Sequence, residues 1–382
     1  MVHVVKRPSF ECIALTLQGG GALGAYQGGV YQGLAEAGLH PDWVAGISIG
    51  AINAAIIAGN DPVSRVEKLR EFWGLITAPS AWNPLKLFEP VAMAGDAGRR
   101  FFNQLGAAEA LTTGVPGFFT PRFPPPQLAP PGSAGATSFY DTTPLVATLE
   151  RFVDFDRINQ GPMRFSAGSV NVRTGNFAYF DSSERKIGPE HILASAALPP
   201  GFPAIEIDGE HYWDGGLVSN TPLQWVLQHG PRRDTLTFQI DLWSARGRVP
   251  RSIMEVATRQ KEILYSSRTR DNVNSFVESQ RLRHAVAKLV DSMPAKLQEN
   301  SKAGVLGAFS DHKVYSIVHL IYRTREYEGD SKDYEFSQLS MSDHWQAGYH
   351  DAIRTLRHPE ALERPQNPDG IATHDFTTAG AE

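Results

Sequence analysis

The stretch WVAGISIGAINAAIIAG spans residues 43–59, and its two halves have different patterns. The five residues before Ser48 are an apolar run typical of a buried strand, and the ten after it are an Ala- and Ile-rich run typical of a buried helix. Gly46 and Gly50 flank the serine, which gives the sequence Gly-x-Ser-x-Gly. At a strand-to-helix turn this sequence predicts a nucleophile elbow, with the Ser48 hydroxyl exposed at the helix N-terminus.

A glycine loop precedes this stretch. Residues 19–24 read GGGALG and separate an apolar run of strand length, residues 12–18, from a helical pattern. Successive amides of a glycine-rich turn at a helix N-terminus can bind an oxyanion. We therefore interpret the amides of Gly19, Gly20 and Gly21 as an oxyanion hole. This interpretation gives the glycine loop and the serine one common role.

The same glycines allow a second interpretation. Gly19, Gly21 and Gly24 fit the G-x-G-x-x-G pattern of dinucleotide-binding proteins, and Asp42 follows at about the distance of a ribose-binding acid. That acid should end the second strand, whereas Asp42 precedes it. We therefore favour the oxyanion hole and keep a dinucleotide-binding protein as the alternative from another functional class.

Asp214 is the carboxylate that we expect to activate Ser48. Residues 205–212 predict two short strands joined by a turn, and Asp214 follows at the strand end. Gly215 and Gly216 come directly after it, so the turn can bring the carboxylate close to another part of the chain.

A Ser-His-Asp triad is the common arrangement for an elbow serine. The chain has 12 histidines, but none lies in a strand-end, glycine-rich setting like that of Asp214. His211 is expected on a hairpin, and His319 lies inside an apolar strand pattern, usually a satisfied core position. The sequence therefore favours a Ser48–Asp214 dyad, with the serine as nucleophile and the aspartate as general base.

Composition restricts the functional class and the compartment. With 382 residues and a formal net charge of -5, the chain is long enough for an enzyme core and poorly suited to general nucleic-acid binding. Cys12 is its single cysteine, and neither a secretory signal nor a membrane span is apparent. These features favour the cytoplasm, with a peripheral membrane contact left open. We find no metal-ligand cluster and expect no cofactor, while the oligomeric state stays open.

A Pro- and Gly-rich insertion occupies residues 78–140, and it shows neither helical nor strand periodicity. It is expected to be either a lid over an acyl pocket or a mobile insertion. A lid could touch a lipid surface through its phenylalanines, which are Phe101, Phe102, Phe118 and Phe119.

The predicted domain organisation has three parts. Residues 10–245 form a catalytic domain, residues 246–358 a mainly helical C-terminal region packed on it, and residues 359–382 a disordered polar tail. The helical segment 251–302 carries ten Lys and Arg against six Asp and Glu. Its basic side could meet anionic lipid, although we favour a solvated helix face.

Three motifs together resemble the patatin-like phospholipase family over roughly residues 12–225. They are Gly19-Gly20-Gly21-x-x-Gly24, Gly46-x-Ser48-x-Gly50 and Asp214-Gly215-Gly216. The resemblance implies a three-layer α/β/α fold with a central, mostly parallel sheet, a Ser48–Asp214 dyad without histidine, and an oxyanion hole from the glycine-loop amides. Many family members carry Arg or Lys where this chain has Leu23, which implies a hole built from backbone alone. Residues 332–345 look like the C-terminal extension of a bacterial patatin-like subgroup.

The expected function is therefore that of a serine acyl hydrolase of lipids. It would cleave carboxylic ester bonds of phospholipids or related lipids through an acyl-Ser48 intermediate. The same machinery could instead act on a neutral lipid, a thioester or a polyester. A membrane-associated scaffold with an unused dyad is a further alternative.

Overall fold

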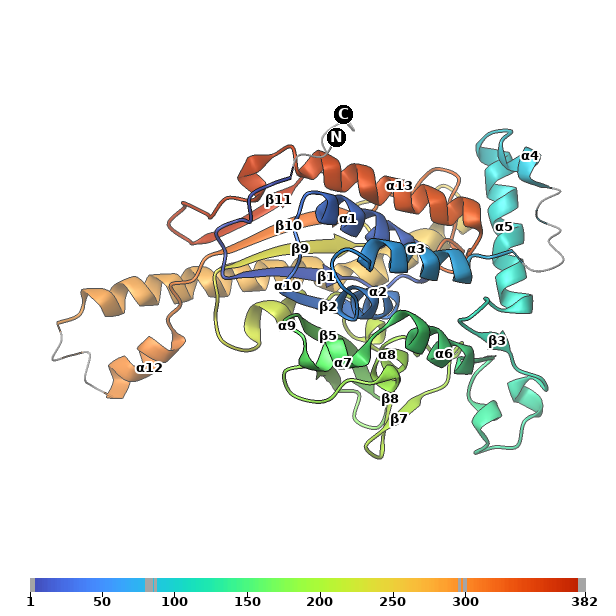
Figure 1. Ribbon diagram of the computed structural model, residues 1–382, viewed down its shortest axis with the longest axis horizontal. Coiled ribbons are helices and arrows are strands. Elements are labelled where there is room, and N and C mark those ends of the chain that lie inside the picture. Colours follow the sequence, from blue (N-terminus) through green and yellow to red (C-terminus); the bar gives the residue numbers. More distant parts are fainter. Residues whose placement is uncertain (1–3, 80–84, 86–87, 295–296, 298–300, 377–382) are drawn as a thin grey trace.

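The structure is a computed structural model that describes residues 4–79, 85, 88–294, 297 and 301–376. Its strands are β1 (Cys12–Leu17), β2 (Trp43–Ile47), β3 (Thr120–Pro121), β4 (Tyr140–Asp141), β5 (Arg164–Asn171), β6 (Phe177–Asp181), β7 (Ile205–Ile207), β8 (Glu210–Asp214), β9 (Thr235–Asp241), β10 (Tyr315–Ile321) and β11 (Ile371–Asp375). Within the described residues, the central sheet has nine strands in the order β11-β10-β9-β1-β2-β5-β8-β7, with β6 also paired to β5 (Figure 1). The strands from β11 to β5 are parallel, and β6, β7 and β8 form an antiparallel edge. The predicted mostly parallel sheet is confirmed.

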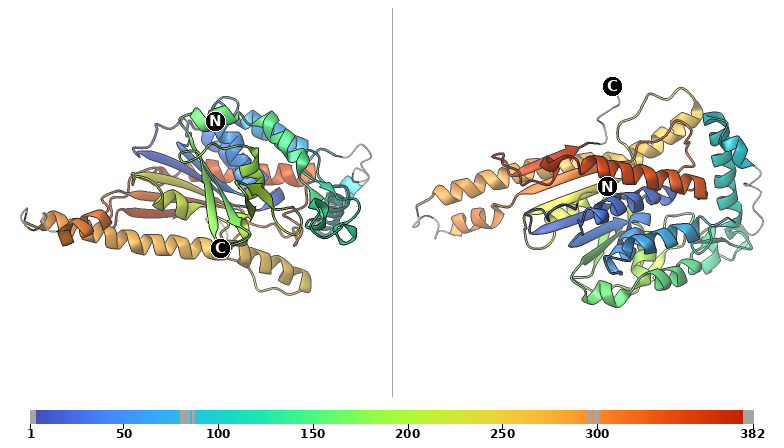
Figure 2. Two further views of the ribbon diagram at one scale, coloured as in Figure 1. Left: turned by 90° about the horizontal axis from the view of Figure 1, so that it is seen from below. Right: turned by 45° about the horizontal axis from the view of Figure 1, so that its top comes forward.

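Helices cover both faces of this sheet (Figure 1 and Figure 2, right). They are α1 (Ala25–Glu36), α2 (Ile49–Ala58), α3 (Arg65–Ile76), α4 (Glu89–Ala92), α5 (Asp96–Thr113), α6 (Thr143–Phe152), α7 (Phe155–Gln160), α8 (Pro189–Ser195), α9 (Leu223–Gln228), α10 (Ile253–Ser292), α12 (Ser301–Phe309) and α13 (Gln338–Thr355). The core on one face includes side chains of α1, α2, α3 and α13, and the core on the other includes those of α9 and α10. The result is the expected three-layer α/β/α fold with C-terminal helices.

The alternation of side chains in β1 explains why this strand is apolar throughout. Ile13, Leu15 and Leu17 point into the core beneath α1 and α2, whereas Cys12 and Ala14 belong to a smaller core on the opposite face. A parallel strand covered on both sides must be apolar on both sides. The same arrangement brings the carboxyl ends of β1 and β2 together at one edge of the sheet, since the two strands pair in parallel.

The prediction that residues 78–140 lack regular structure is wrong for α5. This helix buries Phe102, Gly106 and Ala110, which follow one another at intervals of four residues. Two of these residues are small, so they left little hydrophobic signal in the sequence. Part of the predicted insertion, residues 80–84 and 86–87, lies outside the described residues.

The expected lipid contact through the four phenylalanines is also wrong for three of them. Phe102, Phe118 and Phe119 are buried, and Phe101 alone among the four is exposed. The rings of Phe118 and Phe119 lie 5.8 and 5.2 Å from that of Phe202. They are therefore core residues that attach the insertion to the body of the protein.

The predicted disorder from residue 359 is wrong for the described part of the tail. Residues 371–375 form β11, which extends the sheet parallel to β10 in the register Tyr315↔Ile371. As an edge strand it buries few residues, so its sequence is largely polar. Residues 377–382 lie outside the described residues. The domain division at residue 245 stays a prediction, but the C-terminal region contributes two strands to the same sheet.

Candidate active site

Ser48 occupies a strained turn between β2 and α2. Its backbone has φ 58° and ψ -127°, a conformation that residues with side chains rarely adopt. A Cβ atom at Gly46 would overlap the carbonyl oxygen of Gly50, and one at Gly50 would overlap that of Leu17. The turn therefore needs glycine at both positions, as the nucleophile elbow predicted.

Ser195 of α8 stabilises this turn through two hydrogen bonds. Its Oγ accepts a hydrogen bond from the amide of Ser48 at 3.1 Å and donates one to the carbonyl of Gly168 at 2.6 Å. Ser195 is fully buried, so both bonds are shielded from water. The bond also occupies the Ser48 amide, which is then not available to an oxyanion. The sequence alone predicted no role for Ser195, because its two hydrogen-bond partners lie far from it in the chain.

Asp214 ends β8 and faces Ser48. Its carboxylate accepts a hydrogen bond from the amide of Gly216 at 2.7 Å, and the Ser48 side chain is near enough to lower the pKa of this carboxylate. A Cβ at Gly215 would come within 2.6 Å of the Gly168 carbonyl, so glycine is needed where the turn passes β5. Asp214 is buried, and burial raises its pKa to about 7, although the Ser48 side chain and the Gly216 amide both lower it. The structure thus brings the two predicted dyad residues together.

The glycine loop lies directly beside Ser48. A Cβ at Gly19 would fall 3.0 Å from the Cβ of the serine. The Gly19 carbonyl accepts hydrogen bonds from Asn220 Nδ2 and Trp243 Nε1, each at 2.9 Å. The Gly19 amide donates to the Asn220 carbonyl at 3.3 Å. Gly19 is therefore held on both sides by protein groups.

The amides of Gly20 and Gly21 are placed differently. Because the N–H and C=O groups of a trans peptide point in opposite directions, the fixed Gly19 carbonyl turns the Gly20 amide away from Asn220. The Gly20 carbonyl accepts from the Leu23 amide at 3.2 Å, which fixes the next peptide in the same way. Across the described residues neither amide donates a hydrogen bond. They are the two donors of the loop best suited to an oxyanion.

The C-terminal region also contacts the glycine loop. The carbonyl of Asp333 accepts a hydrogen bond from the Ala22 amide at 2.8 Å. Gly21 has φ 54°, and a Cβ there would overlap the same carbonyl oxygen. Lys261 of α10 holds this segment, since its Nζ donates to the Asp333 carboxylate at 2.8 Å and to the Asp330 carbonyl at 2.7 Å.

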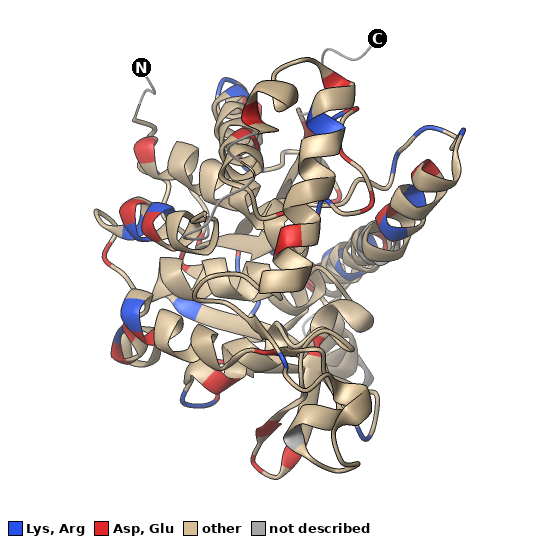
Figure 3. Cartoon of the chain, turned by 90° about the vertical axis from the view of Figure 1, so that its right-hand side faces the viewer, with Lys and Arg blue, Asp and Glu red and all other residues tan. Residues whose placement is uncertain are grey.

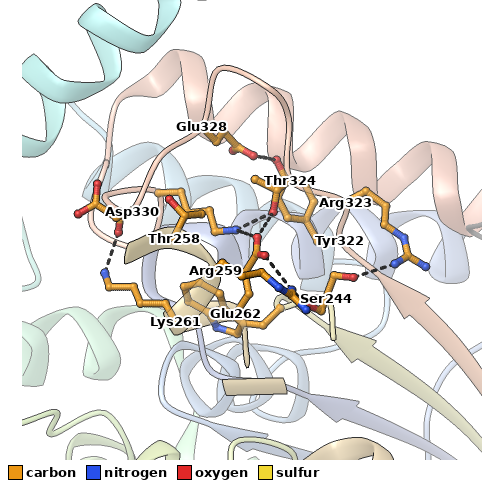
Figure 4. Close-up of polar contacts among 12 residues, drawn as sticks. Ser244, Thr258, Arg259, Lys261, Glu262, Tyr322, Arg323, Thr324, Glu328 and Asp330 are labelled. Atoms are coloured by element: carbon orange, nitrogen blue, oxygen red, sulfur yellow. Dashed lines mark hydrogen bonds and ion pairs between the residues drawn. The ribbon is translucent and has the colours of Figure 1, made fainter. Parts of the chain in front are cut away.

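A polar cluster next to this contact ties residues 322–332 to α10 (Figure 4). Glu262 lies at its centre and accepts hydrogen bonds from Lys332 at 2.8 Å, from Thr324 at 2.9 Å and from Arg259 at 3.1 Å. Lys332 is buried, and its ammonium group is paired with the Glu262 carboxylate. These contacts join segments far apart in the chain, so no local sequence pattern indicates them.

The structure argues against the dinucleotide interpretation. Asp42 lies at the amino end of β2, where its carboxylate accepts hydrogen bonds from Arg7 and from the Ile13 amide. The glycine loop lies at the opposite edge of the sheet, after the carboxyl end of β1. A ribose bound near the loop would therefore not reach Asp42.

Histidine takes no direct part in the arrangement. Within the described residues no histidine is hydrogen bonded to Ser48 or Asp214. His319 lines a cavity of about 320 Å³ on the α10 side of the sheet, so it is not the packed core residue that the sequence predicted. In the same described residues, no group of three or more His, Cys, Asp or Glu is arranged to hold a metal ion, and no helix is long and apolar enough to cross a membrane.

A family model described as "Patatin-like phospholipase" matches residues 15–227, more than half of the chain. The chain belongs to this family. The matched range contains the glycine loop, Ser48 and Asp214, and a second model, described as "Patatin phospholipase", matches residues 263–368. Membership of the patatin-like phospholipase family implies a hydrolase of lipid esters.

Two solved structures of other proteins are similar at a low level. VipD from Legionella pneumophila is 14% identical, with 97% of this chain and 76% of that chain covered and a TM-score of 0.38. ExoU, solved with SpcU from the type III secretion system of Pseudomonas aeruginosa, is 16% identical, with coverages of 78% and 61% and a TM-score of 0.26. These values are too low to support a conclusion about function. Among curated proteins nothing matches.

Proposed function

We propose that the protein is a serine acyl hydrolase that cleaves carboxylic ester bonds of phospholipids or related lipids. Ser48 is the nucleophile and Asp214 the general base of a dyad that works without histidine. The observation that carries the proposal is the approach of the Ser48 side chain to the buried Asp214 carboxylate, at an elbow beside the glycine loop. Family membership supports the lipid ester as the substrate class.

The first half-reaction forms the acyl-enzyme. Ser48 Oγ attacks the ester carbonyl carbon while its proton passes to the Asp214 carboxylate. The carbonyl oxygen becomes an oxyanion, which the amides of Gly20 and Gly21 stabilise. When the tetrahedral intermediate collapses, the C–O bond to the leaving alcohol breaks and that alcohol takes the proton from Asp214.

The second half-reaction releases the fatty acid. Water gives a proton to Asp214 and attacks the acyl-Ser48 carbonyl, again with the oxyanion on the two amides. Collapse breaks the bond to Ser48 Oγ, which recovers its proton from Asp214. A base with a pKa of about 7 suits both steps, because it accepts and returns a proton at neutral pH.

The residue at position 23 affects which lipid headgroups the site can bind. Leu23 is buried and apolar where many family members have a basic residue, so the loop presents no side-chain charge to a phosphate group. A neutral lipid, a thioester or a polyester therefore remains the alternative to a phospholipid.

A substrate panel tests the proposal. Phospholipids, acylglycerols, p-nitrophenyl esters and an aliphatic polyester are compared under one condition, with the Ser48→Ala protein as blank. We expect ester hydrolysis that this variant lacks, highest on a lipid. Hydrolysis of no ester above the blank would contradict the proposal and favour a scaffold with an unused dyad.

A further inference from the structure

The N-terminal half of α10 carries an apolar stripe on its solvent side. Ile253, Val256, Ile263 and Leu264 follow the spacing i, i+3, i+10 and i+11, which places them on one side of a helix. All four are exposed, up to 80% for Ile253 and 65% for Leu264. A solvated face should be polar, so this stripe is unexpected for a helix in water.

The other side of the same helix accounts for its attachment to the protein. Glu262 and Ser266 are buried there, in the polar contacts that join α10 to residues 322–332 and to its own backbone. This half of α10 therefore turns polar residues toward the protein and exposes the apolar stripe to water, with Glu255 and Gln260 also exposed. Figure 2, left, shows the helix running along the lower edge of the molecule, where a flat surface could reach it.

An arginine turn precedes the stripe. It consists of Arg246, Arg248 and Arg251, all exposed, with Val249 exposed between them. Residues 246–256 carry these three arginines against the single acid Glu255, although the whole chain has a formal net charge of -5. Figure 3 shows the basic residues of this turn in blue at the upper right, where the chain enters α10.

The turn also borders a cavity of about 590 Å³ between α5 and α10. Arg100 of α5 lines it together with Arg246 and Arg251. Across the described residues, the guanidinium groups of Arg246 and Arg251 make no ion pair. Arg248 pairs with Glu326 at 3.2 Å, so the positive charge beside the apolar stripe that has no ion-pair partner in the described chain is that of Arg246 and Arg251.

The stripe extends toward the catalytic centre. With a rise of about 1.5 Å per residue, it is about 17 Å long from Ile253 to Leu264. The next residue, Tyr265, accepts a hydrogen bond from Gln18 at 3.2 Å through its carbonyl, directly before the glycine loop. Burial raises the pKa of the Tyr265 phenol to about 12, and the negative charges of Asp333 and Asp214 contribute.

We propose that the apolar stripe and the arginine turn together bind the surface of an anionic lipid bilayer. The helix would lie in the plane of the interface with the stripe among the acyl chains and the arginines on the headgroups. A second copy of this chain would also cover the apolar residues, but its net charge of -5 is spread over a surface of 18249 Å², whereas an anionic bilayer presents dense negative charge to the arginines. Such binding extends the proposed function, because it would bring the lipid to the side of the molecule near Ser48.

Vesicle flotation tests this proposal in the Ser48→Ala background, so that binding is measured without hydrolysis. The probes are vesicles of phosphatidylglycerol mixed with phosphatidylcholine and vesicles of phosphatidylcholine alone. One variant combines Ile253→Ser with Ile263→Ser, and another combines Arg246→Glu with Arg251→Glu. The matched control is Leu282→Ser with Leu289→Ser, which removes leucines that are 57% and 54% exposed farther along the same helix.

We expect binding to the anionic vesicles that falls with salt, and a loss of about tenfold or more in each variant but not in the control. Absence of binding to anionic vesicles, or an equal loss in the control, would overturn the proposal. The proposal would also be overturned if the stripe variant bound vesicles as before but changed from dimer to monomer in sedimentation velocity. That result would identify a second copy of the chain as the partner of the stripe. In the protein with Ser48 intact, hydrolysis of a soluble ester should stay unchanged in both variants, so a failure of membrane binding is separable from a failure of the proposed chemistry.

Discussion

The carbonyl oxygen of Asp333 accepts a hydrogen bond from the amide of Ala22 at 2.8 Å. This contact connects the C-terminal region to the glycine loop, which supplies the proposed oxyanion donors. It makes the loop dependent on residues that are more than 300 positions away in the chain.

Replacing Lys261 should therefore lower the rate of ester hydrolysis. Lys261→Met removes both hydrogen bonds that hold residues 330–333 and leaves the Asp333 carboxylate without its cation. We expect kcat to fall about tenfold, equivalent to about 1.4 kcal/mol of transition-state stabilisation, with little change in KM. Steady-state kinetics on a soluble ester measure this split. The control is Lys68→Met, which removes an exposed ion pair with Glu71. If Lys261 had a purely structural role, its replacement would lower the fraction of active protein and leave kcat per active site unchanged.

Glycine is required at position 21 for two separate reasons. Gly21→Ala would combine a φ of 54° with overlap on the Asp333 carbonyl. We expect loss of activity and a free energy of unfolding lower by more than about 1 kcal/mol. Gly74→Ala in α3 is the matched control, because nothing lies within 4 Å of its added Cβ, and it should stabilise the protein by about 0.5–1 kcal/mol. Urea denaturation measures the free energy of unfolding of both variants. Similar changes in the two variants would contradict the predicted requirement for glycine at position 21.

Ser195→Ala should destabilise the protein, since it removes the buried hydrogen bonds that Ser195 Oγ makes with the Ser48 amide and the Gly168 carbonyl. We expect a decrease of about 1–3 kcal/mol in the free energy of unfolding, together with a lower kcat. Ser316→Ala serves for comparison, because Ser316 is equally buried but its Oγ has no hydrogen-bond partner in the described part of the chain. Equal decreases in the free energy of unfolding of the two variants would show that the hydrogen bonds of Ser195 do not account for its effect on stability.

The pH dependence of hydrolysis should report the ionisation of Asp214. The general base must be a carboxylate, and burial raises its pKa to about 7. Consequently kcat/KM should fall as the pH drops through about 7 and should be constant above it. Asp241 is also buried with a pKa raised to about 7, so Asp241→Asn tests the assignment. The inflection near pH 7 should persist in this variant. Two results would contradict the account: a wild-type inflection near the usual aspartate pKa, or loss of the inflection near pH 7 in Asp241→Asn.

Local sequence patterns predicted the strand-to-helix turn at Ser48 and the strand end at Asp214, whereas the catalytic roles of the two residues stay predictions. The Gly46-x-Ser48-x-Gly50 turn and the strand end at Asp214 each depend on neighbouring residues in the chain, so their geometry can be read from a few positions. The surroundings of the glycine-loop amides could be predicted less well. Gly19 looks equivalent to Gly20 and Gly21 in the sequence, but Asn220 and Trp243 occupy its polar groups in the structure.

Contacts between distant segments could not be predicted in this way. The role of Asp333 depends on its backbone carbonyl, which leaves no mark on residue type. Helix α5 packs through small residues, and β11 is a polar edge strand, so both lack the hydrophobic periodicity on which prediction rests. The apolar stripe of α10 was hidden for a related reason, because its exposure is a property of the folded protein.

Covalent labelling tests the central claim most directly. The protein is treated with a fluorophosphonate and its intact mass and tryptic peptides are measured, beside Ser48→Ala and Asp214→Asn. The account predicts one adduct per chain, located on Ser48, absent in the first variant and formed much more slowly in the second. An adduct on another residue, or labelling of Asp214→Asn at the wild-type rate, would contradict it.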